Sequence, residues 1–260
     1  MDASAILIKI IVCFIAGLGA GFGTGFAGMS AVTVISPMLI TFVGLPTYQA
    51  VGIGLASDIL ASAVSARTYA KNKNIDIKNG VIMMVAVLIM TLVGSWIANF
   101  MPDTTMGSLS VIMTLFLGLK FLIWPVKTTK EDMKKKSSRA YVIQSLIGGA
   151  YIGFVCGFMG AGGGLMMLLV LTTVMRYELK TAVGTSVFIM TFTAITGSVS
   201  HFVIGGIPDL MCLILCIIFT FLWSRVSSKI ANDANPVLLN RLTGMILTAT
   251  GIVIGILRFL

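Results

Sequence analysis

A single carboxylate, Asp58, lies inside a long apolar stretch of the chain, while the other eight acidic residues lie in or beside polar segments. Gly54 and Ser62 stand one helical turn to either side of it, and Ser65 follows on the same face. A carboxylate buried in lipid costs a few kcal/mol, and such residues normally face a cavity on an ion or proton path. We therefore predict that Asp58 is an ion-coupling group for H+ or Na+. The alternative is a neutral, hydrogen-bonded acid that joins two helices.

Glycines gather at two places where the backbone itself could bind an anion: Gly23-Thr24-Gly25 and the run from Gly160 to Gly164. Each glycine destabilises a helix by roughly 1 kcal/mol, so these runs predict unwound backbone beside a helix N-terminus. Exposed N–H groups there, at the positive end of the helix dipole, bind anions without a charged side chain. The alternative for the outer glycines is close helix packing. The predicted substrate-binding residues are Gly23, Thr24, Gly25, Gly160, Gly162, Gly163 and Gly164.

Hydroxyl groups follow in the segment Ala182-Val183-Gly184-Thr185-Ser186. We predict that Gly184, Thr185 and Ser186 lie opposite the glycine break, where the hydroxyls donate to substrate oxygens. The alternative is that both hydroxyls bond back to the preceding helical turn, as is usual in membrane helices. The lone histidine, His201, is expected to be an ordinary interfacial residue, with a proton relay as the alternative.

The glycine motif occurs twice at a constant offset of 132 residues. Each copy has the pattern GF-x-x-GF-x-G, once over 21–28 and once over 153–160, and Ala50-Val51-Gly52 recurs as Ala182-Val183-Gly184 at the same offset. Two halves that each begin with a glycine-broken hydrophobic segment are typical of secondary transporters.

The composition indicates an integral membrane protein. Hydrophobic residues make up 57% of the chain, charged residues only 10%, and the mean hydropathy is +1.04. A soluble domain carries about 25% charged residues, so this chain could not cover a water-facing surface. The net charge of +9 does not indicate nucleic-acid binding, because the basic residues lie in short loops between apolar runs. We expect no cofactor and no metal site.

The apolar runs predict an all-α protein with ten membrane segments, because about 20 residues cross a bilayer. The segments near 29–44 and 163–176 are short and follow the glycine motifs, so each is either a tilted helix or the returning arm of a re-entrant hairpin. The ten segments lie near 5–24, 29–44, 48–66, 79–100, 106–124, 141–160, 163–176, 181–203, 208–224 and 237–257.

The basic residues predict the orientation. Sixteen of the 18 fall in loops on one side of this arrangement, and only Lys9 and Arg258 fall on the other. The side rich in lysine and arginine is normally cytoplasmic, so both termini are expected outside. The prediction is a first repeat at 1–126, a basic cytoplasmic linker at 127–139 and a second repeat at 140–260. An odd number of segments in each half makes the two repeats inverted in the membrane.

The chain resembles the sulfite exporter TauE/SafE family of bacterial and archaeal membrane transporters. The resemblance lies in the paired glycine motifs, in the Gly-rich run at 160–164, in Ala-Val-Gly-Thr-Ser at 182–186 and in Asn-Ile-Asp at 74–76. It implies a cell-membrane permease of two related halves, whose path in the second half is formed by Gly160 to Gly164 and Gly184 to Ser186. In place of the expected Thr-Ser pair in the first half, this chain has Ile53-Gly54 and then Asp58.

We therefore expect a multi-pass secondary transporter for a small anion, either sulfite, an organosulfonate or another sulfur oxyanion, working by alternating access and coupled to protons or sodium. The chain shows no Walker A motif, so it does not hydrolyse ATP itself. A membrane-embedded enzyme is disfavoured by the single histidine and the single intramembrane acid. A passive anion channel or a non-transporting scaffold subunit is the alternative. The expected partners are the anion, the lipid bilayer and the coupling ion; the sequence is also compatible with a homodimer.

Overall fold

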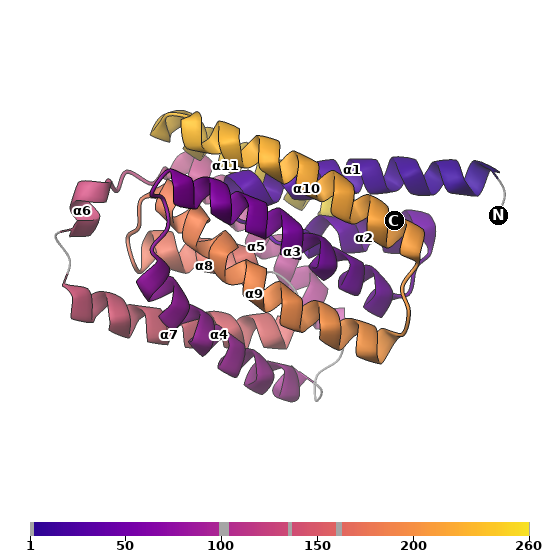
Figure 1. The fold of residues 1–260 in the computed structure, drawn as a ribbon, viewed down its shortest axis with the longest axis horizontal. Coiled ribbons are helices and arrows are strands. Elements are labelled where there is room, and N and C mark those ends of the chain that lie inside the picture. Colours follow the sequence, from indigo (N-terminus) through magenta and orange to yellow (C-terminus); the bar gives the residue numbers. More distant parts are fainter. Residues whose placement is uncertain (1–2, 99–103, 135–136, 160–162, 260) are drawn as a thin grey trace.

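The computed structural model describes residues 3–98, 104–134, 137–159 and 163–259, and within them the chain is all helical. Figure 1 shows the long helices as a bundle whose axes run roughly along one direction. In chain order the helices are α1 Ala3–Ala27, α2 Val32–Val43, α3 Thr47–Lys71, α4 Ile77–Ala98, α5 Thr104–Ile123, α6 Lys130–Lys134, α7 Ser138–Met159, α8 Gly163–Thr173, α9 Leu179–Gly205, α10 Leu210–Asp233 and α11 Pro236–Phe259.

Helices occupy all ten of the predicted apolar segments, and the short α6 lies in the predicted linker. In the described residues, seven helices are long and apolar enough to cross a membrane: α1, α3, α4, α7, α9, α10 and α11. The helices α2 and α8 have only 12 and 11 residues. At about 1.5 Å of rise per residue, neither could cross a hydrocarbon core of about 30 Å. Each follows a longer helix, so both halves show the same order of long, short and long.

Two helices extend beyond the predicted segments by more than one turn. α3 continues to Lys71 instead of ending near 66, and α10 continues to Asp233 instead of ending near 224. The added turns of α10 contain Ser227, Ser228 and Asn232, which are buried. The apolar run ends before the helix does, because these turns pack against other polar parts of the protein rather than lipid.

The core lies along α3 and α9, which pack against each other. Within their spans, 61% and 56% of the residues are buried, against 28–33% in the other long spans. The outer helices instead expose large apolar side chains, such as Ile89 on α4 and Ile15 on α1, as lipid-facing residues do. The helices that the others surround are therefore among the less apolar of the long spans in the described chain, with a mean hydropathy of 1.3 for α3 and 1.5 for α9 against 2.4 for α1.

The outer glycines of both motifs bring helices from opposite halves into close contact. On α1, a Cβ atom at Gly21 would lie 2.8 Å from the backbone nitrogen of Ser224 on α10. On α7, a Cβ atom at Gly153 would lie 2.8 Å from Cα of Val87 on α4. The first helix of each half thus packs on the fourth helix of the other half. For these outer glycines the structure supports the alternative given above, which is close helix packing.

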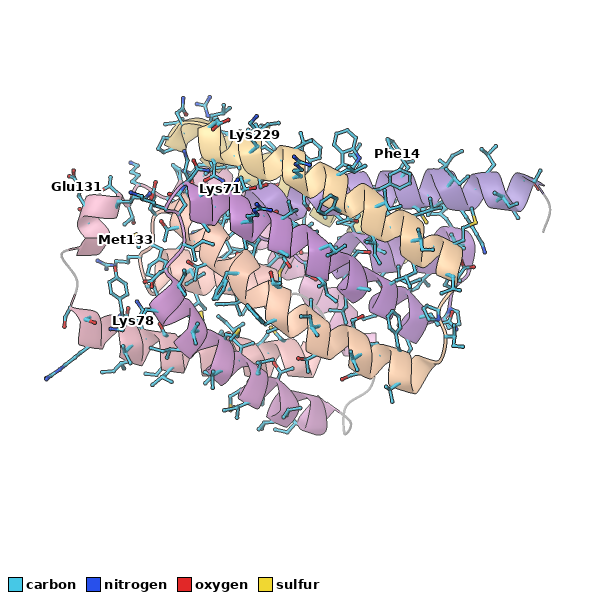
Figure 2. The ribbon with its side chains drawn as sticks, viewed as in Figure 1. Phe14, Lys71, Lys78, Glu131, Met133 and Lys229 are labelled. Carbon is cyan, nitrogen blue, oxygen red and sulfur yellow. The ribbon has the colours of Figure 1, made fainter. Side chains whose placement is uncertain are left out.

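Basic side chains gather at the end of the bundle that holds α6. Figure 2 shows Lys71, Lys78 and Lys229 toward this end, with Glu131 on α6 itself. The linker folds back onto the bundle, since the backbone oxygen of Met133 accepts a hydrogen bond from the Tyr141 hydroxyl at 3.0 Å. Arg67 and Lys71, which were predicted in a loop, lie on the last turns of α3, as a result of its greater length.

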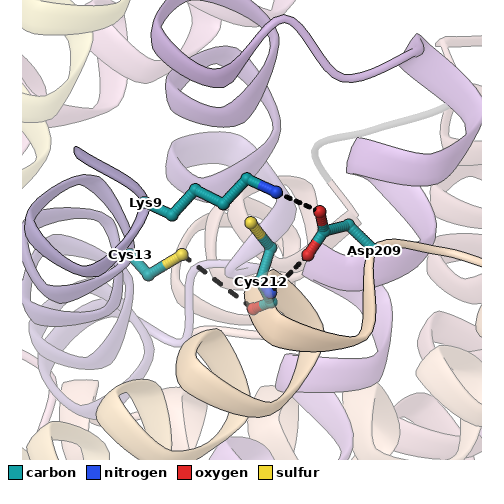
Figure 3. Close-up of polar contacts among 4 residues, drawn as sticks. All are labelled: Lys9, Cys13, Asp209 and Cys212. Atoms are coloured by element: carbon teal, nitrogen blue, oxygen red, sulfur yellow. Dashed lines mark hydrogen bonds and ion pairs between the residues drawn. The ribbon is translucent and has the colours of Figure 1, made fainter. Parts of the chain in front are cut away.

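The opposite end of the bundle contains an ion pair that joins α1 to α10. Lys9 pairs with Asp209, whose other carboxylate oxygen accepts a hydrogen bond from the backbone nitrogen of Cys212 at 2.9 Å and so caps α10 (Figure 3). The thiol of Cys13 points toward the backbone oxygen of Cys212 in the same region. Lys9 is one of the two basic residues predicted on this side, and it is neutralised here by its partner.

Candidate functional site

The first half of the chain breaks at residues 28–31, between α1 and α2. Gly28 has a positive φ of 60°. Its backbone nitrogen donates to the oxygen of Thr24 at 3.0 Å, and the nitrogen of Met29 donates to the oxygen of Gly23 at 3.1 Å. The first of these bonds is the one by which a left-handed glycine commonly ends an α-helix.

The break therefore lies later than predicted. Gly23, Thr24 and Gly25 belong to the last turns of α1 and are not unwound. Gly25 packs against Ser227 and Ser228 of α10, and the Thr24 hydroxyl lies 2.9 Å from the backbone oxygen of Met29, where it braces the turn. Isolated glycines stay helical when close packing offsets their cost of about 1 kcal/mol.

Asp58 caps the helix that follows this break. Its carboxylate accepts hydrogen bonds from the hydroxyl of Ser30 and, at 2.6 Å, from the backbone nitrogen of Ala31. These donors stand directly before the first residue of α2, so the carboxylate lies at the positive end of that helix. Asp58 is fully buried near the middle of α3. The first break is thus occupied by a carboxyl group from the protein itself.

The start of α8 lies against the first break. A Cβ atom at Gly164 would lie 3.0 Å from the backbone nitrogen of Ser30 and 2.8 Å from the sulfur of Met190. Met190 stands 132 residues after Asp58, so it is the counterpart of Asp58 in the second half. A thioether is a weak hydrogen-bond acceptor without charge. The second half therefore lacks the carboxylate that caps α2 in the first.

A cavity of about 250 Å³ lies where these two helix starts meet. Asp58, Ser30, Gly163 and Gly164 line its buried part. The first N–H groups of a helix have no partner within it, and in α8 these belong to the residues from Gly163 onward. The remaining wall comes mainly from α4 and α9 and includes Leu55, Val87, Leu88, Thr91, Leu92, Cys156, Met167, Thr193, Ala194, Thr196, Gly197, Ser200 and His201.

Of the predicted substrate-binding residues, the structure brings Gly163 and Gly164 into the cavity together with Asp58. Gly160 and Gly162 lie outside the described residues. Gly23, Thr24 and Gly25 lie in α1, where the contacts described above concern its packing and its last turn.

Gly184, Thr185 and Ser186 lie away from the cavity lining. The hydroxyl of Thr185 accepts a hydrogen bond from the backbone nitrogen of Asp76 at 3.1 Å, and Gly184 packs against Asn74. The hydroxyl of Ser186 donates to the backbone oxygen of Val183 at 2.8 Å. Thr185 and Gly184 thus hold the loop between α3 and α4 against α9.

The same loop is held by a second contact from the other half. The hydroxyl of Tyr177, which precedes α9, donates to the Asp76 carboxylate at 2.7 Å. Burial and the nearby Asp76 raise the pKa of Tyr177, so its hydroxyl keeps its proton at neutral pH. The Asn-Ile-Asp segment therefore anchors the α3–α4 loop between the halves.

Several cavity residues were not predicted as binding residues. Thr193, Thr196 and Ser200 follow one another at intervals of three and four residues on α9, and Thr91 lies in the wall from α4. Their helical spacing is visible in the sequence, but it does not show which face of α9 meets a cavity. His201, expected at an ordinary interface, also lines the cavity and is half-buried.

Metal ligands do not cluster in the part of the chain that the structure describes. No three histidine, cysteine or acidic side chains among these residues come close enough to hold a metal ion. The four thiols, including Cys156 in the cavity wall, are free. The chemistry that the cavity offers is hydrogen bonding, helix dipoles and one carboxylate.

The comparison with known protein families agrees with this geometry. Residues 13–254 match the family described as sulfite exporter TauE/SafE. The chain belongs to this family. Members of the TauE/SafE family are membrane transporters rather than enzymes, and this chain is a multi-pass membrane protein.

Relatives named as transporters match the chain over most of its length. A probable membrane transporter protein of Methanocaldococcus jannaschii is 30% identical over 261 residues, covering 94% of this chain and 93% of the relative. The probable membrane transporter protein YunE of Bacillus subtilis is 26% identical over 228 residues, covering 80% and 84%. A probable membrane transporter protein of Haemophilus influenzae is 27% identical over 207 residues, covering 79% and 78%.

Proposed function

We propose that this chain is a secondary transporter that moves a small sulfur oxyanion, sulfite or a short organosulfonate, across the cell membrane. The observation that supports this most is the cavity at the start of α8, where Gly163 and Gly164 present backbone next to a buried space. N–H groups at a helix start bind anions by their direction and by the helix dipole. The family name, sulfite exporter TauE/SafE, supplies the substrate class.

The difference between the two breaks supports the start of α8 as the anion site. The carboxylate of Asp58 already occupies the start of α2, whereas the counterpart position beside α8 is Met190. A substrate anion would cap the N-terminus of α8 in the same way as the Asp58 carboxyl group caps the N-terminus of α2. The cavity volume of about 250 Å³ suits a small ion, since pockets for drug-sized ligands begin near about 300 Å³.

We propose that residues 1–126 and 140–260 are repeats of inverted topology, joined by the cytoplasmic linker 127–139. The exchanged packing supports this, because α1 contacts α10 while its counterpart α7 contacts α4. The pairs α3 with α9 and α5 with α11 join counterpart helices directly. Repeats of this kind place the substrate at their interface and allow alternating access by movement of one half against the other.

Asp58 is the proposed coupling group, for H+ or Na+. It is fully buried, it lines the cavity, and it binds the backbone at the break through Ala31. Protonation or a bound cation would weaken its hold on the start of α2, which links the ion to the shape of the substrate cavity. Gly23, Thr24, Gly25, Gly184, Thr185 and Ser186 then act in helix packing and loop anchoring.

Flux of labelled sulfite, thiosulfate and sulfoacetate into proteoliposomes tests this function. The proposal expects saturable uptake of at least one of these anions, and a dependence on an imposed pH or sodium gradient. Uptake that rises linearly with concentration indicates a passive channel instead. Absence of any flux above that of empty liposomes indicates a scaffold subunit and contradicts the proposal.

A further inference from the structure

The hydroxyl groups that line the described cavity wall all donate their hydrogen to the protein itself. In the buried part, Ser30 donates to the Asp58 carboxylate. On α4, Thr91 donates to the backbone oxygen of Val87 at 2.7 Å. On α9, the three hydroxyls donate to backbone oxygens of their own helix: Thr193 to Met190 at 3.3 Å, Thr196 to Phe192 at 3.5 Å and Ser200 to Thr196 at 2.9 Å.

A hydroxyl group has one hydrogen to donate and two lone pairs that accept. Because these hydrogens are already used, the hydroxyl oxygens can offer the cavity only lone pairs. Apart from the half-buried His201, whose imidazole also carries a donor, the polar side chains of the wall formed by α4 and α9 therefore offer hydrogen-bond acceptors. The backbone donors in the described lining lie at the start of α8, at Gly163 and Gly164.

A simple anion such as nitrate is suited to only one side of this cavity. Its oxygens can accept from the N–H groups of α8, but they face lone pairs on Thr91 and Thr193. A buried acceptor without a donor loses the hydrogen bond that it makes in water. An anion that also carries an O–H or N–H group can accept hydrogen bonds from the start of α8 and donate one to the hydroxyl oxygens of α4 and α9.

We infer that the cavity selects small anions that carry a hydrogen-bond donor, so that the favoured substrates are singly protonated oxyanions, such as hydrogensulfite, or hydroxyalkyl sulfonates. The anionic oxygens face the start of α8, and the donor faces the acceptor wall of α4 and α9. This inference rests on the proposed function, because it requires this cavity to be the substrate site.

Two matched pairs of anions test the inference by competition against labelled sulfite in proteoliposomes. 2-Hydroxyethanesulfonate differs from ethanesulfonate by one hydroxyl group, and hydrogencarbonate has the planar shape and the charge of nitrate but carries one O–H group. We expect the donor-bearing member of at least one pair to compete about tenfold better, which corresponds to about one hydrogen bond. Equal competition within both pairs, or competition by none of the four anions, overturns the inference.

Variants show whether the wall causes the preference. Thr193→Val and Ser200→Ala each remove lone pairs, so the tenfold preference should fall to about threefold or less. Thr68→Val is the matched control, because Thr68 also donates to the backbone of its own helix, at 2.9 Å to Val64, but does not line the cavity. A preference that survives both wall variants unchanged overturns the inference.

The same experiment separates this inference from the proposed function. Gly163→Leu fills the cavity, so it should block sulfite flux whether or not the wall selects donors. If flux is blocked in Gly163→Leu and the anions within each pair compete equally, the cavity is still the substrate site, and only the inferred preference for donor-bearing anions is wrong. If Gly163→Leu leaves the flux unchanged, the cavity is not the substrate site, and the proposed function is contradicted as well.

Discussion

The carboxylate of Asp58 lies 2.6 Å from the backbone nitrogen of Ala31, so a side chain from the middle of α3 caps the start of α2. The bond joins two elements at the point where the chain is broken, and Ser30 strengthens it from the same turn. Any change in the charge of Asp58 therefore changes the strength of the hydrogen bonds that hold Ser30 and Ala31 beside the cavity. This contact directly connects the proposed coupling group to the proposed substrate site.

Replacement of Asp58 by asparagine removes the charge and keeps the shape. The amide oxygen can still accept from Ala31, but the amide nitrogen cannot accept from Ser30. We expect uptake driven by an ion gradient to fall at least about tenfold, while exchange of internal for external anion persists. Hydrogen bonds to charged groups contribute about 1.5–3 kcal/mol, so the free energy of unfolding should also fall.

Paired flux assays of Asp58→Asn, one with a gradient and one in exchange mode, separate coupling from stability. Ser57→Ala is the control, because the Ser57 hydroxyl donates to the backbone of its own helix at 2.8 Å and does not line the cavity. Full gradient-driven uptake by Asp58→Asn would show that Asp58 only joins helices. The ion that controls wild-type flux, H+ or Na+, identifies the coupling ion.

The glycines of α1 should differ in their tolerance of a methyl group. At Gly21 a Cβ atom would lie 2.8 Å from a backbone nitrogen of α10, whereas at Gly19 its nearest contact is the Val34 side chain at 3.3 Å. We expect Gly21→Ala to lower the free energy of unfolding by about 1–3 kcal/mol, as overpacking does, and Gly19→Ala to change it much less. Thermal unfolding in detergent gives both values, and equal effects would show that α1 and α10 are not tightly packed at Gly21.

The ion pair between Lys9 and Asp209 gives a stability effect that depends on pH. Burial of the Asp209 carboxyl opposes ionisation, but the hydrogen bonds from Lys9 and Cys212 outweigh it and hold its pKa below the ordinary value of 3.8. A lowered pKa stabilises the fold at pH values above the ordinary one, and this contribution is lost as the pH falls through the lower value.

Asp209→Asn should therefore lower the unfolding temperature at pH 7 and at pH 5. The difference from wild type should shrink only below about pH 4. Asp233→Asn, at the other end of α10, is the control and should have little effect because Asp233 is exposed. A difference that already disappears between pH 7 and 5 would contradict the assignment to Asp209.

The sequence predicted some parts of this site because single residues carry the signal. An acid in an apolar run is conspicuous wherever it points, and the glycine run before α8 marks a helix start by composition. The ten apolar segments could be predicted from their length, since the bilayer sets it.

Other parts depend on contacts between distant segments. Thr185 and Ser186 resemble binding residues, but Thr185 meets Asp76, 109 positions earlier in the chain. Gly23 and Gly25 resemble a helix break, yet packing against α10 keeps them helical and moves the break to Gly28. Such outcomes follow from which helix lies opposite, and local composition does not contain that information.

The orientation of the halves can be measured by cysteine labelling in a background without the four native cysteines. Ser4 at the start of α1 and Glu131 in the linker are both exposed. We expect a membrane-impermeant thiol reagent to label Ser4→Cys in intact cells and Glu131→Cys only after the membrane is opened. Labelling of both positions from the same side would contradict the inverted arrangement.

Counterflow of labelled sulfite in proteoliposomes tests the central claim, that an anion is carried through the cavity at the start of α8. A Cβ atom at Gly163 would meet only side chains, the nearest being the sulfur of Cys156 at 2.9 Å, so Gly163→Leu should fold and fill the cavity. With unlabelled sulfite inside, we predict a transient accumulation of external label by the wild type, and a loss of at least about tenfold in Gly163→Leu, with Gly163→Ala between the two. The absence of accumulation in the wild type, or equal accumulation in wild type and a folded Gly163→Leu, would contradict the account.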